Sequence, residues 1–105
     1  MQLVEFYLYN QLLDIYGVLL TEAQREISND YYRLNLSLSE ISENRKISRA
    51  AVSDALSIAK NKLSEYESKM GLLAKKDRAT EIYNQLLLTE DVKTKELLKK
   101  LWEVL

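Results

Sequence analysis

The chain has 105 residues, of which 47% are hydrophobic and 30% charged, and its formal net charge at pH 7 is −1. A chain of this length buries one modest core, so we predict a single domain over residues 1–105. Cysteine and histidine are absent, which excludes disulfides, thiol chemistry and the usual zinc ligands. The apolar runs are short and interrupted by charged or amide side chains, so we expect a cytoplasmic protein with no membrane span and no signal peptide.

The chain contains no proline and only two glycines, a composition that predicts a nearly all-helical protein. The first helix covers about residues 2–16 and should end at Gly17, a natural C-terminal cap. Its apolar side chains lie on almost every face, which predicts that it is covered on more than one side. Thr21 and Gln24 form a capping-box pattern, which opens a second helix that reaches Leu34.

A helix-turn-helix pattern follows. Ser37 should cap a short helix that ends near Asn44, and Ser48 should cap a long helix that Gly71 ends. Lys46 stands between these two helices, where glycine or asparagine often takes the left-handed conformation. We therefore expect a left-handed turn at this lysine, at a small cost in strain.

The C-terminal extension over residues 72–105 is predicted to hold two more helices. One runs from about Leu73 to Leu87, and Thr89 should cap a last, amphipathic helix in which lysines alternate with leucines. The predicted fold is therefore an all-α bundle with a helix-turn-helix at residues 37–60, an additional N-terminal helix and C-terminal helices.

The charge is unevenly distributed along the chain. Residues 1–37 carry a net charge of −3, residues 38–62 carry +2, and the remainder has eight charges of each sign. The positive segment coincides with the helix-turn-helix. Two surplus charges are few beside the number that a protein uses to neutralise DNA phosphates.

Residues 20–63 resemble region 4 of sigma-70-type transcription factors. The resemblance is carried by the leading Leu-Thr, the tyrosine pair, the Glu-Ile of residues 40–41 and the Ile-Ser-x-x-Ala-Val run of residues 47–52. With the flanking segments LLDIYGVLLT and LSEYESKMGL, residues 10–72 are similar to the small YlxM family of sigma-region-4-like helix-turn-helix proteins. The resemblance implies a link to the signal recognition particle pathway, because genes of that family lie beside genes of the particle.

The recognition helix departs from the sigma pattern in its charges. A sigma recognition helix typically carries basic side chains at the positions that are Ser53, Ala55 and Ile58 here. Asp54 adds a negative charge on the solvent side, which opposes phosphates. At 100° per residue, Ile58 lies roughly 130° from the centre of the core face, so we expect another apolar surface to cover it.

The candidate contacts with nucleic acid or with a protein partner are the basic and hydroxyl side chains around the turn and along the recognition helix. They are Arg45, Lys46, Ser48, Arg49, Ser53, Ser57 and Lys60. For Ser48, Arg49, Ser53 and Ser57, helix capping and solvation are the competing interpretation. Glu22, Glu26 and Asp30 form an acidic row at four-residue spacing, which could dock a basic surface or hold Mg²⁺. A solvated helix face is the interpretation we favour for that row.

Neither an enzyme nor a cofactor is expected. No general base stands at motif spacing to a nucleophile, and no glycine-rich loop could cradle phosphates. The first functional hypothesis is a non-enzymatic regulatory or accessory protein that contacts protein or RNA components of the signal recognition particle, as the resemblance implies. The alternatives are a sequence-specific transcriptional regulator that binds duplex DNA through residues 48–60, and a helical scaffold. Because cations are lacking at positions 53, 55 and 58, we expect duplex binding to be weak.

The apolar surplus of the first and last helices predicts self-association, with a homodimer expected. The candidate contact residues are Tyr9, Ile58, Leu101 and Trp102. The alternative is that the two terminal helices cover each other, together with Ile58, inside one chain.

Overall fold

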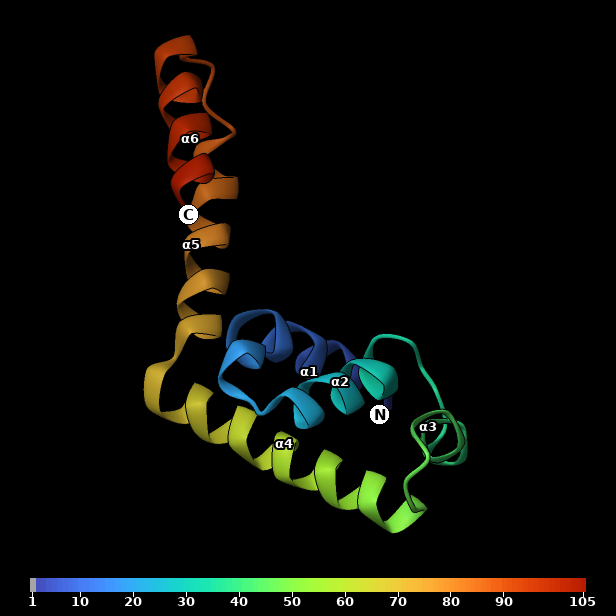
Figure 1. Cartoon of the computed structure of the whole chain (residues 1–105). Helices are drawn as coiled ribbons and strands as arrows, with labels where there is room; N and C mark the ends of the chain where they lie inside the picture. Colours follow the sequence, from blue (N-terminus) through green and yellow to red (C-terminus); the bar gives the residue numbers. More distant parts are fainter. Residues whose placement is uncertain (1) are drawn as a thin grey trace. The chain divides into compact units, whose positions relative to one another are not determined.

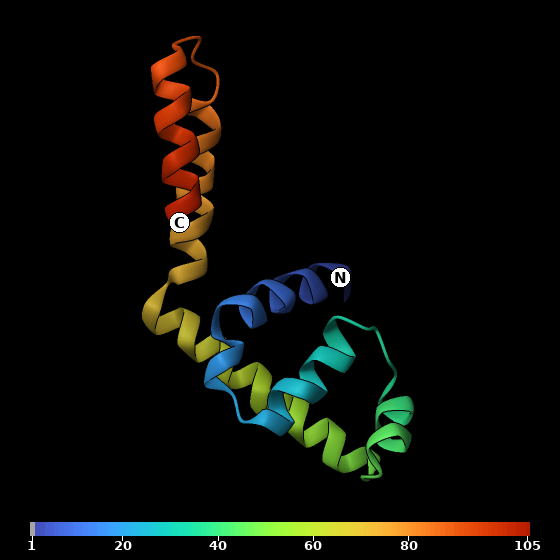
Figure 2. The same cartoon turned by 45° about the horizontal axis from the view of Figure 1, so that its top comes forward.

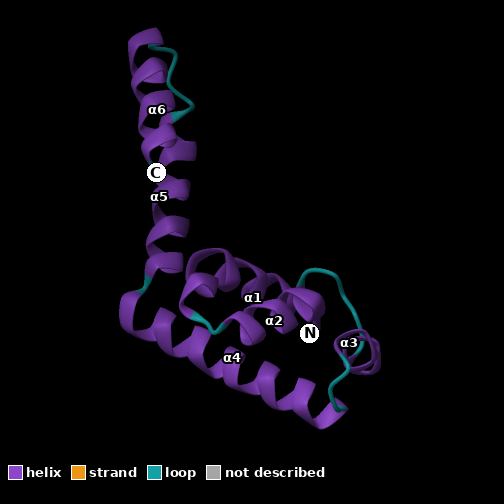
Figure 3. Cartoon of the chain, viewed as in Figure 1, coloured by secondary structure: helices purple, strands orange, loops and turns teal. Residues whose placement is uncertain are grey.

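The computed structural model describes residues 2–105, and the chain is helical throughout apart from short connections (Figures 1 and 3). The elements in chain order are α1 (Gln2–Tyr16), the 3-10 helix η1 (Gly17–Leu19), α2 (Glu22–Tyr32), α3 (Leu38–Arg45), α4 (Arg49–Met70), α5 (Leu72–Leu86) and α6 (Val92–Val104). Residues 2–105 include no strand. The predicted all-α fold is therefore confirmed. No helix in this range is both long and apolar enough to cross a membrane.

The chain divides into two compact units, Met1–Leu73 and Ala74–Leu105. The first unit holds helices α1 to α4 with the helix-turn-helix. The second is a hairpin made of most of α5 together with α6. The single domain that we expected over residues 1–105 stays a prediction.

The first unit is organised around α4, which contacts α1, α2 and α3 (Figure 2). Val52, Leu56, Ala59 and Leu63 are all buried and recur at intervals of three or four residues along this helix. Such spacing places them in one apolar stripe on a single helix face. The stripe determines which face of α4 packs against the core and which face is exposed and available to contact another molecule.

The first helix buries one face within this chain. Tyr9, Leu12, Leu13 and Tyr16 are buried and lie within an arc of about 100°, whereas Leu3 and Val4 are exposed. Coverage of the other sides of α1 stays a prediction.

Tyr9 belongs to the buried part of α1, which corrects its assignment to a self-association surface. Its residue exposure is 7%, its ring stacks on Tyr32 with centroids 5.4 Å apart, and its hydroxyl shares a 2.8 Å hydrogen bond with Ser64. An apolar pattern on every face of a helix does not reveal which side the rest of the chain covers. The side that carries Tyr9 is covered by this chain itself.

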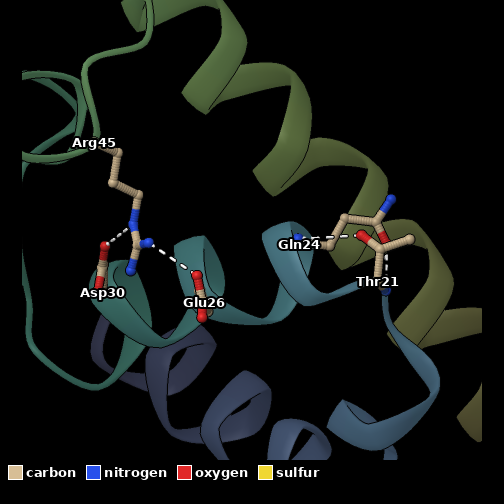
Figure 4. Close-up of polar contacts among 5 residues, drawn as sticks. All are labelled: Thr21, Gln24, Glu26, Asp30 and Arg45. Atoms are coloured by element: carbon tan, nitrogen blue, oxygen red, sulfur yellow. Dashed lines mark hydrogen bonds and ion pairs between the residues drawn. The ribbon is translucent and has the colours of Figure 1, made fainter.

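Four of the predicted helix ends are confirmed. Thr21 and Gln24 form the capping box at the start of α2 (Figure 4), and Ser37 caps α3 in the same way. The Ser48 hydroxyl accepts a hydrogen bond from the third backbone N–H of α4. Gly71 ends α4 in the left-handed conformation, with φ of 61°.

Three helix ends differ from the prediction. Gly17 is not a left-handed cap, because the chain continues there into the 3-10 helix η1. The second helix stops before Leu34, since Asn35 takes a positive φ of 55° and turns the backbone away. Asp91, rather than Thr89, caps α6, because its carboxylate accepts from the N–H of Lys93.

Candidate functional site

The turn between α3 and α4 is built without glycine. Lys46 adopts the left-handed conformation, with φ of 56° and ψ of 45°, which confirms the expected turn. Its N–H donates to the carbonyl of Ser42, and the Ser42 hydroxyl donates to the carbonyl of Ile47 at 2.7 Å. The backbone N–H of Ile47 also donates to Ser42. These bonds satisfy the end of α3 and define the entry into α4, the recognition helix of the motif.

The exposed face of the recognition helix is almost neutral. In its first three turns the exposed side chains are Arg49, Ala50, Ala51, Ser53, Asp54, Ser57 and Ile58. This face therefore carries one cation and one anion. Ile58 is 47% exposed. That another apolar surface covers Ile58 stays a prediction.

Arg45, a candidate contact residue, is engaged by carboxylates of its own chain (Figure 4). Its Nε donates to Asp30 Oδ2 at 2.6 Å, and its Nη1 donates to Glu26 Oε2 at 3.0 Å. The hydrogen bond to Asp30 raises the pKa of the Arg45 guanidinium above its ordinary value, and the negative charges of both carboxylates add to this. Two members of the acidic row on α2 thus hold an arginine at the end of α3. The solvated face that we favoured is wrong for Asp30, which is buried, whereas the Glu26 side chain stays 46% exposed.

Lys60, another candidate, forms an ion pair with Glu5 of α1. Its ammonium also lies 5.5 Å from the centroid of the Tyr9 ring. The hydrogen bond that Lys60 donates to Glu5 raises the pKa of the Lys60 ammonium. The carboxylate compensates the charge of this lysine on the recognition helix. Glu5 was not among the predicted site residues, and no local signal indicates it, because 55 residues separate it from Lys60.

The candidate residues fall into two groups. Ser53, Ser57 and Lys60 line one open hollow with a volume of about 200 Å³. The other residues that line it are Glu5, Tyr31, Tyr32, Leu38 and Leu56. The remaining candidates lie at the turn and at the start of α4. Among these, Ser48 uses its hydroxyl to cap the helix, as the competing interpretation expected.

The described residues offer no group of three or more histidine, cysteine or acidic side chains placed to hold a metal ion. The hollow brings together hydroxyls, two tyrosines and a compensated ion pair. Such an arrangement suits recognition of another molecule by surface contact.

A short helix and a longer one, joined by a left-handed turn and packed on a small core, define a helix-turn-helix protein. Residues 4–104 match the model of the UPF0122 family, whose description is "Putative helix-turn-helix protein, YlxM / p13 like". The chain belongs to this family.

Relatives in several bacteria support this assignment. The UPF0122 protein Teth514_1714 of Thermoanaerobacter sp. is 39% identical over 108 residues, which cover 95% of this chain and 90% of the relative. The UPF0122 protein TTE1463 of Caldanaerobacter subterraneus is 49% identical over 71 residues, or 68% of this chain and 61% of the relative. The UPF0122 protein MYPE4850 of Malacoplasma penetrans is 41% identical over 75 residues, or 71% of this chain and 70% of the relative.

Proposed function

We propose that this chain is a non-enzymatic helix-turn-helix protein that acts as a regulatory or accessory component of the signal recognition particle pathway, through contacts with protein or RNA. The pathway part of the proposal rests on the resemblance to the YlxM family. The mode of action rests on one observation, which is that Arg45 and Lys60 are paired with carboxylates of the same chain.

Paired cations contribute less to duplex binding than free ones. A DNA-binding protein gains most of its non-specific affinity by placing Lys and Arg on phosphates and releasing counterions. Among the described residues of the helix-turn-helix, Lys46 and Arg49 are the cations outside any ion pair. Two phosphate contacts are few, whereas the serines and apolar side chains around them suit a protein or a folded RNA.

A pull-down tests the proposal directly. The tagged full chain should recover protein or RNA components of the particle from a native lysate at physiological salt. Repeating the experiment after nuclease treatment separates protein contacts from RNA contacts. Arg49→Ala should reduce the recovery, while Lys93→Ala, which removes a cation from α6, serves as the matched control. Failure to recover any component of the particle would refute the proposal.

The second candidate is a sequence-specific DNA-binding regulator. It is favoured by the geometry of the turn and by the exposed Arg49, Ser53 and Ser57 on the recognition helix. If the first proposal holds, the affinity for duplex DNA should be no better than about 10⁻⁴ to 10⁻⁶ M at physiological salt, which is the non-specific range. Ser53→Lys and Ile58→Arg should strengthen this binding and steepen its dependence on salt. Nanomolar affinity for one sequence in an anisotropy titration would favour the regulator over the first proposal.

A further inference from the structure

The second unit leaves most of its large apolar side chains exposed. Helices α5 and α6 lie side by side and antiparallel (Figures 1 and 2), and the rings of Tyr83 and Trp102 meet with centroids 4.7 Å apart. Among the described residues of this unit, Leu98 is the one apolar side chain that is buried, at 5% exposure. A unit shorter than about 40 residues usually needs an additional source of stability, such as oligomerisation.

The last helix carries an apolar arc that is too wide for one neighbour to cover. At 100° per residue, the arc extends over about 160° of α6. The side chains in this arc are Leu97, Leu98, Leu101, Trp102, Val104 and Leu105. Leu98 and Trp102 face α5, while Leu97, Leu101 and Val104 form an exposed flank beside them.

The fifth helix continues this flank. Ile82 and Leu86 are one turn apart, and both are exposed. At 100° per residue, Ile82 and Leu86 lie about 60–100° to one side of Tyr83 around α5. Leu97 and Leu101 lie about 100–140° to the same side of Trp102 around α6. Because the two helices are antiparallel and meet through those rings, the same angular offset places both pairs on one side of the hairpin.

We propose that this side of the hairpin pairs with the same side of a second copy, so that two hairpins form a four-helix bundle. We call this surface the hairpin face, and its residues are Ile82, Leu86, Leu97, Leu101 and Val104, each between 42% and 83% exposed. Its five residues are all apolar, so the face can pair with itself about a two-fold axis. Near-antiparallel helices with apolar seams are the usual components of such bundles.

The hairpin face can supply the apolar centre of an interface. Taking about 100 Å² for each fully exposed apolar side chain, its five residues expose an area on the order of 270 Å². Each partner in a stable interface buries about 800 Å², a third or more of which is polar, so side chains around the face would supply the rest. Residues 74–105 carry seven basic and six acidic side chains, a net charge of +1, so two hairpins approach without strong net repulsion.

Sedimentation equilibrium of the full chain at about 50 μM tests the proposal, a concentration well above the micromolar range typical of weak complexes. We expect twice the mass of one 12.2 kDa chain. Leu101→Glu should reduce this to a single chain with its helical circular dichroism retained. Val92→Glu is the matched control, because Val92 is 68% exposed on the far side of the same helix, and it should remain a dimer.

Crosslinking provides a second measurement that does not depend on a disruptive charge. The chain has no cysteine, so Leu101→Cys and Val92→Cys each introduce a unique thiol. A short bismaleimide should join Leu101→Cys into dimers and leave Val92→Cys largely monomeric. A monomer mass for the unaltered chain would overturn the proposal and favour coverage of the face within one chain. Equal crosslinking of the two variants would also overturn it.

Discussion

Removal of the Glu5 carboxylate should expose a cation on the recognition helix. In Glu5→Gln the ion pair with Lys60 is lost, whereas Lys46 and Arg49 are unchanged. The number of available cations in the helix-turn-helix then rises from two to three. Each phosphate neutralised contributes about −0.9 to the slope of log K against log salt, so the slope for duplex binding should change from about −1.8 to about −2.7.

Fluorescence anisotropy with a short labelled duplex measures this slope. Between about 50 and 200 mM salt, the unaltered chain should lose affinity about 12-fold and Glu5→Gln about 40-fold. The advantage of the variant over the unaltered chain should therefore be about three times larger at the lower salt concentration. A stem-loop RNA can replace the duplex, because its phosphates are neutralised by the same side chains.

Asp14→Asn is a matched control for this measurement. It removes the same charge from the same helix, yet it frees Arg33 at the end of α2 instead of a residue of α4. Its slope should stay near that of the unaltered chain. Equal slopes for the two variants would refute the reasoning, because binding would then follow net charge and not the recognition helix.

Three further predictions concern stability. Ser48→Ala should lower the free energy of unfolding in urea by about 1 kcal/mol, because the N-cap of α4 is lost. Unchanged melts would mean that α4 does not depend on this cap. Ser28→Ala should raise that free energy by about 1–2 kcal/mol, since the buried Ser28 hydroxyl has no hydrogen-bond partner among the described residues. The exposed Ser57→Ala controls for helix propensity, and a loss of stability in Ser28→Ala would reveal a bound partner. Burial raises the pKa of Tyr16 and, more strongly, that of Tyr32. The folded state therefore holds their protons more tightly than the unfolded chain. The stabilisation that the two tyrosines give to the folded state is therefore complete below about pH 10. It is lost as the pH rises above this value, so melting temperatures should fall there.

The helix ends could be predicted from the sequence because capping is local. A serine or threonine and a partner three residues later specify the start of α2 or α3 without reference to the rest of the chain. The left-handed turn at Lys46 was predictable for the same reason. The assignment of Thr89 as a cap failed because two suitable side chains stand close together. Thr89 accepts from the N–H of Asp91, and Asp91 is the one that accepts from an N–H of α6.

The charge of the candidate site could be predicted only in part. The scarcity of cations on the recognition helix is visible in the sequence at Ser53 and Ile58. The compensation of Arg45 and Lys60 is not visible, because it depends on which faces of α1 and α2 turn toward the helix-turn-helix. The misplacement of Tyr9 has the same origin. Long-range packing decides these contacts, and no local pattern reports it.

The central position of α4 also determines how this protein can adapt to a partner. The same continuous helix carries the recognition surface and the buried stripe against which α1, α2 and α3 pack. Its middle amides should therefore exchange with solvent only when the whole unit unfolds. A recognition helix of this kind cannot bend or shift separately, so it meets its partner as a preformed, rigid surface. The adjustment of shape on binding, with its cost in conformational entropy, then falls on the partner.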